Sequence, residues 1–267
     1  MKKTFYAVVF ALSTFHVAHA QLVKNDFMEG INIGESIEKV VYDNKKSPIQ
    51  SNSWHLSAFH AKIDGASPVA VAPLEYPGYI ESGKSNAFEL KRLSEHNGSR
   101  HTGYSLTNKN TYSSGIYYLT FMMNVSPSTL SGDNNVRGVI MFNGTHTSDF
   151  KRVVCYVKRI GKDKVVFGLS EKDGDNEAVV FTDKTYDLEK TNLLVLKYNI
   201  DENKASLFVN PKMAKKEPKA DVSIDVTIPF FKEYGIRAIT VRQRSHHSEK
   251  IGGLRFAKDW TSAIGVE

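Results

Sequence analysis

Four acidic residues alternate along one short segment, and two paired carboxylates are the simplest chemistry they could perform. The segment is EKDGDNE at residues 171–177, and its acids are Glu171, Asp173, Asp175 and Glu177. Carboxyl groups about 5–5.5 Å apart would suit retaining glycoside hydrolysis, with one as the nucleophile and the other as the acid. Gly174 and Asn176 favour a turn instead, and the segment lacks the apolar neighbours that raise a catalytic carboxyl pKa. We therefore expect a solvated turn, with a weak calcium loop as the alternative.

Histidines form a second group with chemical potential, since they transfer protons near neutral pH and bind zinc. They lie in loops and after a strand, at His96, His101, His146, His246 and His247. His246 and His247 would need a third zinc ligand supplied by the fold, and the sequence does not name one. We expect no metal cofactor at these histidines.

Arginine and tyrosine side chains share strand faces opposite apolar residues. Alternation places Arg152 and Tyr156 opposite Cys155, and Arg137 opposite Ile140. Planar guanidinium groups and phenol rings suit flat polar ligands such as sugars or acidic glycans, although a salt-bridged surface is the alternative. The residues that we expect to bind a ligand are Arg137, Arg152, Tyr156, Arg242, Arg244, His246 and Trp54.

The elements that must position these groups are strands, because alternation with a period of two dominates the chain. Turn residues separate the runs, and 193–200 with 204–209 reads as a hairpin. The polar stretch 94–115 predicts a long loop, and short helical turns are expected near 34–39 and 229–233. The expected strands are 57–62, 88–93, 116–125, 136–142, 152–158, 164–169, 178–182, 193–200, 204–209, 222–228, 236–243 and 251–257. Many strands without intervening helices predict an antiparallel sandwich or barrel, and we expect one domain over residues 21–267.

The first 20 residues have the features of a cleavable signal peptide. Lys2 and Lys3 precede an apolar run at 4–15, and Ala18-His19-Ala20 is a small-x-small cleavage site. The run is shorter than the roughly 20 residues that span a bilayer. The sequence therefore predicts a secreted or periplasmic protein that is not inserted in a membrane.

Charge and cysteine content exclude further classes. The net charge of +6 falls to +4 without Lys2 and Lys3, and the basic residues are scattered, which argues against a nucleic-acid partner. Cys155 is the single cysteine, so no disulfide can form within the chain. Its place in the alternating run RVVCYVK indicates a buried structural thiol.

Ordered short elements resemble those of secreted bacterial proteins with the concanavalin A-like (laminin G-like) jelly roll, although no single element is specific. The resemblance covers about residues 24–262. Its elements are Asp26-Phe27, LEYPGY at 74–79, YYLTF at 117–121, RVVCYVK at 152–158, FGLS at 167–170, TNLLVLKY at 191–198, LFVNP at 207–211, Glu217-Pro218, VRQ at 241–243, and LRFA at 254–257 with Trp260.

This resemblance implies a two-sheet antiparallel jelly-roll sandwich, and it raises two further expectations. Many such domains hold a structural calcium between an N-terminal acid and an acid at the start of the last strand. Asp26 matches the first, but Gly252 replaces the second, so only a weak calcium site is expected. Jelly-roll polysaccharide lyases use His and Tyr as base and acid, with Arg or Asn neutralising the uronate carboxylate. Those residue types are present, but the ordered lyase motifs are absent.

The sequence thus predicts a secreted, non-catalytic module that binds glycan or acidic polysaccharide through the concave sheet face and adjoining loops. A polysaccharide-degrading enzyme, either a lyase or a glycoside hydrolase, is the first alternative. A structural or adhesive protein with a protein partner is the second. The sequence leaves the oligomeric state open.

Overall fold

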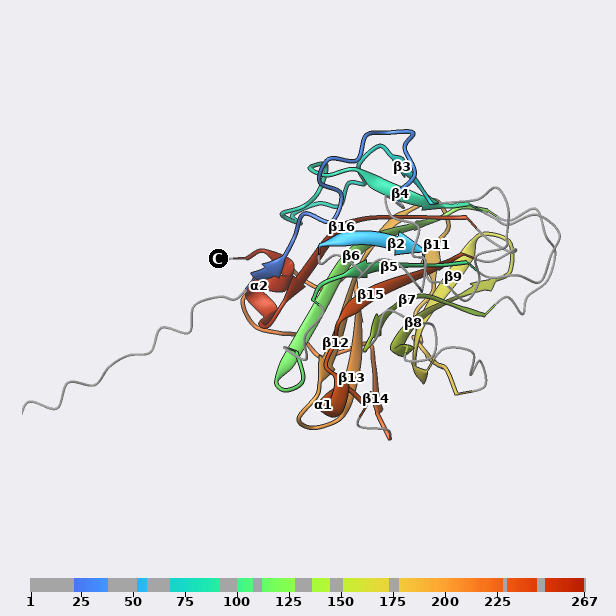
Figure 1. Ribbon diagram of the computed structural model, residues 1–267. Coiled ribbons are helices and arrows are strands. Elements are labelled where there is room, and N and C mark those ends of the chain that lie inside the picture. The colour runs from blue at the N-terminus through green and yellow to red at the C-terminus, as the bar shows by residue number, and fades with distance from the viewer. Residues whose placement is uncertain are drawn as a thin grey trace, which may run out of the picture.

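Two antiparallel eight-stranded sheets face each other in the computed structural model (Figure 1). The structure describes residues 22–37, 52–56, 68–91, 100–107, 112–127, 136–144, 151–172, 178–227, 230–243 and 248–266. The first sheet has the order β14 (Val222–Asp225), β13 (Lys204–Val209), β12 (Thr191–Asn199), β6 (Ile116–Val125), β16 (Glu249–Ala257), β4 (Ala87–Leu90) and β3 (Val69–Val71), and β1 (Leu22–Lys24) pairs with β16. The second sheet has the order β10 (Val180–Phe181), β9 (Lys164–Lys172), β8 (Lys151–Ile160), β7 (Arg137–Asn143), β15 (Ala238–Gln243), β5 (Arg100–Ser105) and β2 (Ser53–Leu56), and β11 (Tyr186–Asp187) pairs with β9. The fold is the all-β jelly-roll sandwich predicted from the sequence.

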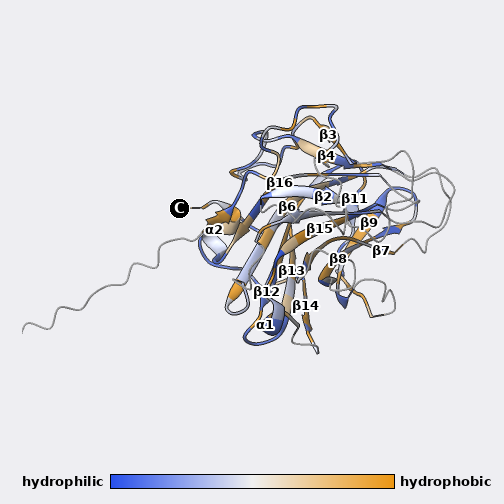
Figure 2. Cartoon of the chain, in the orientation of Figure 1, coloured by the Kyte–Doolittle hydropathy of each residue, from blue (hydrophilic) through white to orange (hydrophobic). Residues whose placement is uncertain are grey.

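The core lies between the two sheets. It is made by the residues along each strand whose side chains point inward. Leu119 and Phe121 of β6 meet Phe167 and Leu169 of β9 in one cluster of buried side chains. Figure 2 shows orange, apolar stretches on strands of both sheets. Burying each such side chain stabilises the fold by roughly 1.5–3 kcal/mol, so the sandwich needs no disulfide.

Cys155 is the buried structural thiol that the sequence predicts. The thiol is fully buried in the core, and burial raises its pKa well above the ordinary value. A neutral, enclosed thiol is a packing group and not a nucleophile.

Several predicted strand bounds are confirmed, and one stretch is wrong. β6 and β13 have the predicted bounds, and the β12–β13 hairpin forms as expected. The stretch 94–115 was expected to be a loop, but residues 100–105 form β5, an internal strand between β15 and β2. The outward residues of β5 are polar or glycine, so its outward face lacks the β-branched and aromatic residues that are typical of strands.

Two short helices complete the described fold, α1 (Phe230–Tyr234) and α2 (Trp260–Ile264). The first matches the helical turn expected near 229–233, and the second was not predicted. The other expected turn, near 34–39, is not a helix over its described residues 34–37. In α2, Trp260 packs on Phe208 and its indole Nε1 donates to the carbonyl of Ala214, which fixes α2 against the outer face of the first sheet.

No helix within the described ranges is long and apolar enough to span a membrane. The predicted signal peptide at residues 1–20 lies outside the described residues.

Buried tyrosines predict how the fold responds to alkali. Burial raises the pKa of Tyr117 and Tyr198 from about 10 to about 12. Their neutral phenols therefore stabilise the folded state fully below pH 10, and this contribution is lost as the pH rises towards 12. We expect the midpoint of urea unfolding to fall over that interval, and to fall less in a Tyr198→Phe variant. An unchanged midpoint between pH 10 and 12 would contradict the assigned shifts.

Candidate functional site

The outer face of the second sheet carries a row of side chains set by strand register. Trp54 and Tyr104 pair across β2 and β5 and point into the core, so their neighbours in sequence point outward. One outward row therefore runs across the sheet through His55, Gly103, Thr240, Met141, Val154 and Ser170. Ser170 lies at the β9 end of this row, and the polar residues His55 and Thr240 lie towards its β2 end.

Five residues at that end form what we call the His–Arg cluster: His55, His101, Asn143, Thr240 and Arg242. His101 of β5 stands directly opposite Arg242 of β15. Facing side chains on paired strands have Cβ atoms about 4.5–5.5 Å apart, so the imidazole and the guanidinium are neighbours. Asn143 Nδ2 donates to Thr240 Oγ1 at 3.2 Å, which orients the amide within the cluster.

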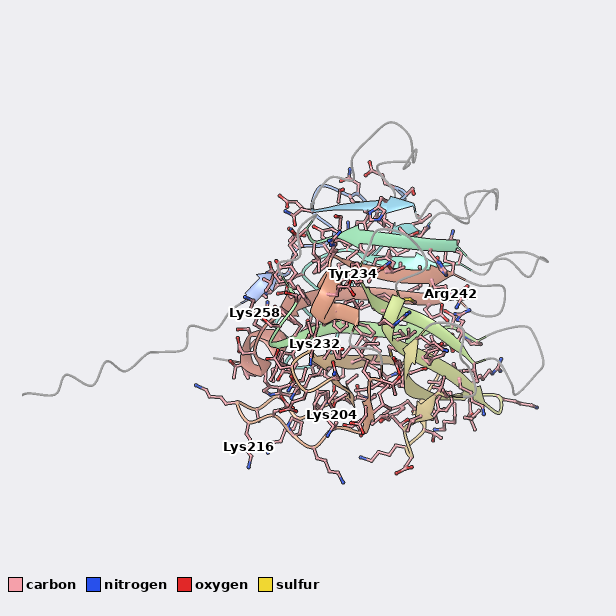
Figure 3. The ribbon with its side chains drawn as sticks, turned by 60° about the horizontal axis from the view of Figure 1, so that its bottom comes forward. Lys204, Lys216, Lys232, Tyr234, Arg242 and Lys258 are labelled. Carbon is pink, nitrogen blue, oxygen red and sulfur yellow. The ribbon has the colours of Figure 1, made fainter. Side chains whose placement is uncertain are left out.

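Gly103 allows His55 to lie over the sheet. A Cβ atom at position 103 would come within 2.9 Å of His55 Nε2, which is closer than real Cβ contacts. The imidazole thus occupies the space that a side chain at this position would fill, and it lies beside Thr240. Both histidines and the arginine are buried, with exposed fractions of 2% for His55, 3% for His101 and 7% for Arg242. Figure 3 labels Arg242 near the end of β15, away from the exposed Lys204 of β13 and the exposed Lys216 of the loop between β13 and β14.

An apolar patch continues the same face beyond the cluster. Met141, Val154 and Tyr156 are fully buried there and contact Phe181. Tyr156 donates its hydroxyl to the carbonyl of Lys172 at 3.1 Å. Tyr156 lies on the expected face, but that part of the face is covered and its hydroxyl is already engaged.

Two of the residues expected to bind a ligand point into the sandwich instead. The register of β7 and β8 shifts between Gly138 and Ile140, so simple alternation fails there. Arg137 is consequently buried and forms an ion pair with Glu249 of the opposite sheet. Trp54 is also a core residue, and its indole Nε1 donates to the carbonyl of Phe27 at 2.7 Å. The expectation that Arg137 and Trp54 lie on the open face is wrong.

The remaining expected residues divide into described and undescribed positions. Arg152 is partly buried beside Val153, whose φ of 53° marks an irregularity in β8. Glu171 accepts hydrogen bonds from the backbone N and Oγ1 of Thr227, at 3.0 and 2.7 Å, and so ties β9 to the end of β14. Several expected residues lie outside the described residues: His96, His146, Asp173, Asp175, Glu177, Arg244, His246 and His247.

The weak calcium site expected at Asp26 has no support among the residues described. Asp26 is exposed, and no group of three or more His, Cys, Asp or Glu side chains in the described ranges is arranged to hold a metal. The glycines that replace the second acid serve packing. A Cβ at Gly252 would lie 2.8 Å from the Cβ of Ala87, and Gly253 adopts a φ of 58° at an irregularity of β16.

His55 is the histidine of the cluster that the sequence analysis did not single out. The alternation in SWHL, with Trp54 and Leu56 apolar and Ser53 and His55 polar, was the available signal. It was weak because four residues fit many local structures.

No protein-family model matches the chain, and no curated protein matches it. Solved structures match it at low identity. A carbohydrate esterase from the Shiga toxin-encoding bacteriophage phi24B is 9% identical, with 78% of this chain and 90% of that chain covered and a TM-score of 0.47. An alginate lyase from Klebsiella pneumoniae is 10% identical over 73% of this chain and 82% of that chain, with a TM-score of 0.40. The family 7 alginate lyase A1-II′ is 9% identical over 65% and 79%, with a TM-score of 0.42.

These matches concern the sandwich fold, and they correct one expectation. The sequence favoured a protein without enzymatic activity, whereas alginate lyases recur among the solved structures that match this chain. That expectation is wrong in its direction.

Proposed function

We propose that the protein is an enzyme that cleaves an acidic polysaccharide by β-elimination at the His–Arg cluster. The observation that carries the proposal is the pairing of His101 with Arg242 on one sheet face, with His55 opposite Gly103 two residues along β5. Alginate lyases among the matched structures act by cleaving a polyuronate, which agrees with this substrate class.

The reaction needs three groups, and the cluster holds all three types. A uronate carboxylate must be neutralised before the carbon that bears it gives up its proton, and the fork of Arg242 suits a carboxylate. Neutral His101 takes that proton, and the electrons of the C–H bond form a carbon–carbon double bond as the bond to the glycosidic oxygen breaks. His55 gives a proton to the leaving oxygen.

Burial supports such chemistry, because charge interactions are stronger where water is excluded. Arg242 is 7% exposed, more than His55 or His101. It therefore marks the side from which a uronate would approach. Export through the predicted signal peptide would place the enzyme where polysaccharides occur outside the cell. The net charge of +4 that remains without Lys2 and Lys3 favours acidic polymers over neutral ones.

The test is turnover of a panel of polymers by the purified mature chain. Polyuronates such as alginate, polygalacturonate and glucuronan are compared with neutral glucans, and the ultraviolet absorbance of the unsaturated uronate product is followed. We expect absorbance to rise with at least one polyuronate and with no neutral glucan. Reducing ends released without that absorbance would indicate hydrolysis and overturn the elimination mechanism, as would inactivity on every polyuronate.

Gly103 offers a test of the position of His55. A Gly103→Ala variant places a methyl carbon 2.9 Å from Nε2 of His55, closer than real Cβ contacts, so the imidazole must move. We expect kcat to fall about tenfold or more, since a proton-transfer group contributes about 10²–10⁴-fold. Ser105→Ala is the matched control. It changes the same strand and face, and the Ser105 hydroxyl is buried without a hydrogen-bond partner among the described residues. Equal activity of the two variants would remove His55 from the mechanism.

A further inference from the structure

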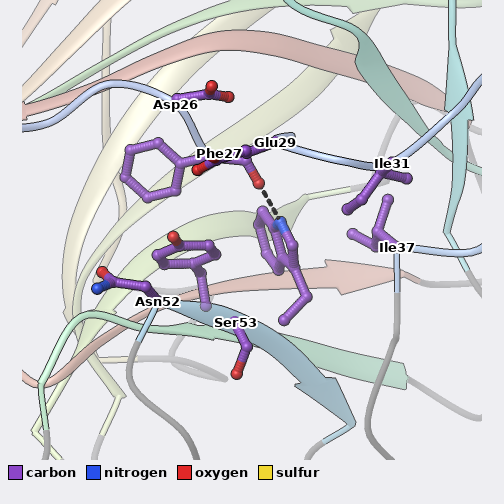
Figure 4. A pocket seen from close by; sticks show the side chains of 9 residues that line it. Asp26, Phe27, Glu29, Ile31, Ile37, Asn52 and Ser53 are labelled. Atoms are coloured by element: carbon purple, nitrogen blue, oxygen red, sulfur yellow. Dashed lines mark hydrogen bonds between the residues drawn. The ribbon is translucent and has the colours of Figure 1, made fainter.

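A separate cavity opens on the other side of β2 and β5. It has a volume of about 170 Å³ and is lined by Asp26, Phe27, Glu29, Ile31, Ile37, Asn52, Ser53, Trp54 and Tyr104. Figure 4 shows the N-terminal segment with Asp26, Phe27 and Glu29 along one side, and Asn52 and Ser53 of the β2 region along the other. We call this cavity the aromatic pocket. It lies on the core side of β2 and β5, whereas the His–Arg cluster lies on their outer side.

Three aromatic rings make the wall of the aromatic pocket rigid. The rings of Phe27 and Tyr104 have centroids 4.6 Å apart, and those of Trp54 and Tyr104 lie 5.2 Å apart at 76°. The hydrogen bond from Trp54 Nε1 to the Phe27 carbonyl, dashed in Figure 4, locks the segment onto β2. Such a wall presents ring faces that attract cations and the C–H groups of a ligand.

The polar groups in the aromatic pocket favour a ligand that donates hydrogen bonds and carries a positive charge. The Asp26 and Glu29 side chains are exposed at the cavity, and ionised carboxylates only accept hydrogen bonds. The Tyr104 side chain is only 3% exposed, and it lines the cavity beside these two carboxylates. Burial, followed by the charges of Asp26 and Glu29, raises the pKa of Tyr104, so its phenol stays protonated.

The chain already places one cation beside this wall. The Lys24 ammonium lies 6.0 Å from the centroid of the Tyr104 ring. This contact indicates that the electrostatic environment near Tyr104 accepts an ammonium group. The size of the cavity limits the ligand to one ring, since a cavity of about 150 Å³ holds a single benzene molecule.

We propose that the aromatic pocket binds a single-ring ligand that carries an ammonium group, of the size and chemistry of an amino sugar. The ring stacks on the aromatic wall, the ammonium pairs with Asp26 and Glu29, and a ligand hydroxyl bonds the Tyr104 phenol. This site does not depend on catalysis at the His–Arg cluster, because the two lie on opposite sides of β2 and β5.

The test uses tryptophan fluorescence, since the chain has two tryptophans and Trp54 lines the pocket. In a Trp260→Phe background, glucosamine is expected to change Trp54 emission, while glucose and N-acetylglucosamine leave it unchanged. Isothermal calorimetry on the unaltered protein repeats the comparison without the background substitution. Asp26→Asn and Glu29→Gln are each expected to weaken glucosamine binding about tenfold, as the loss of a charge-assisted hydrogen bond predicts. Glu202→Gln, an exposed acid in the β12–β13 turn, is the matched control and should bind as the unaltered protein does.

Other outcomes would overturn the proposal. Equal binding of all three sugars would mean that the ammonium is not recognised. A fluorescence change with calcium chloride alone would mean that the Asp26 and Glu29 carboxylates bind a metal ion. Calorimetry that detects no heat with any of the three sugars would mean that the pocket does not bind an amino sugar. Polyuronate turnover is measured in the same variants. A variant that loses glucosamine binding but keeps polyuronate turnover would show that the aromatic pocket and the His–Arg cluster act independently. The failure of one proposal can then be distinguished from the failure of the other.

Discussion

Replacing Glu249 by glutamine is expected to lower the free energy of unfolding by about 3–5 kcal/mol, the cost of leaving one partner of a buried ion pair uncompensated. Glu249 is fully buried on β16, and its partner Arg137 is 1% exposed on β7 of the opposite sheet. The guanidinium cannot lose its proton to escape the penalty. The variant is measured by urea unfolding at neutral pH beside the unaltered protein.

A double variant separates the value of the pair from the penalty of breaking it. Arg137→Met combined with Glu249→Leu removes both charges and keeps apolar volume between the sheets. We expect it to recover most of the stability that Glu249→Gln loses, since apolar replacement of a buried pair is often neutral or stabilising. Lys164→Met combined with Asp187→Leu, at an exposed pair on β9 and β11, is the control and should change stability little. A Glu249→Gln variant as stable as the unaltered protein would mean that the Arg137 charge reaches water.

The same ion pair shows why part of the site could not be predicted. Alternation assumes an unbroken ladder, and it places Arg137 on the outward face with Met141. The shift between Gly138 and Ile140 turns Val139 and Ile140 both inward, and Arg137 then meets a carboxylate 112 positions away in sequence. No local sequence pattern predicts this β-bulge, and none predicts a partner 112 positions away in the chain.

Where the ladder is regular, the sequence was enough. β6 and β13 are runs rich in apolar residues that turn residues bound, and their bounds were predicted without error. The outward position of Arg242 was also predicted, because β15 keeps its alternation from Ala238 to Gln243. Its partner His101 lay in a stretch taken for a loop, since β5 is polar on its outer side. The cluster therefore emerges only when strand pairing is known, because pairing joins β2, β5, β15 and β7, which are far apart in the chain.

Removal of the Arg242 side chain is expected to have the largest effect on activity. In an Arg242→Ala variant, kcat/KM on the preferred polyuronate should fall by about 10²–10³-fold, as when one donor to a developing negative charge is removed. The physical reason is that the carboxylate must be neutralised for its neighbouring carbon to release a proton to His101. Arg159→Ala is the control. Arg159 lies at the β8–β9 turn, where its guanidinium donates to the carbonyls of Gly161 and Lys162, and its loss should leave kcat/KM unchanged.

A change in the substrate distinguishes this role from a structural one. Methyl esterification removes the uronate charge but leaves the proton to be abstracted. If Arg242 neutralises the carboxylate, its removal should cost far less on the esterified polymer than on the free acid, because the group it pairs with is absent. If Arg242 only supports the fold of β15, both substrates should lose activity by the same factor, and the thermal midpoint of the variant should fall with them. A loss that depends on the free carboxylate, in a variant that keeps its thermal midpoint, is the result that the opposed positions of His101 and Arg242 predict.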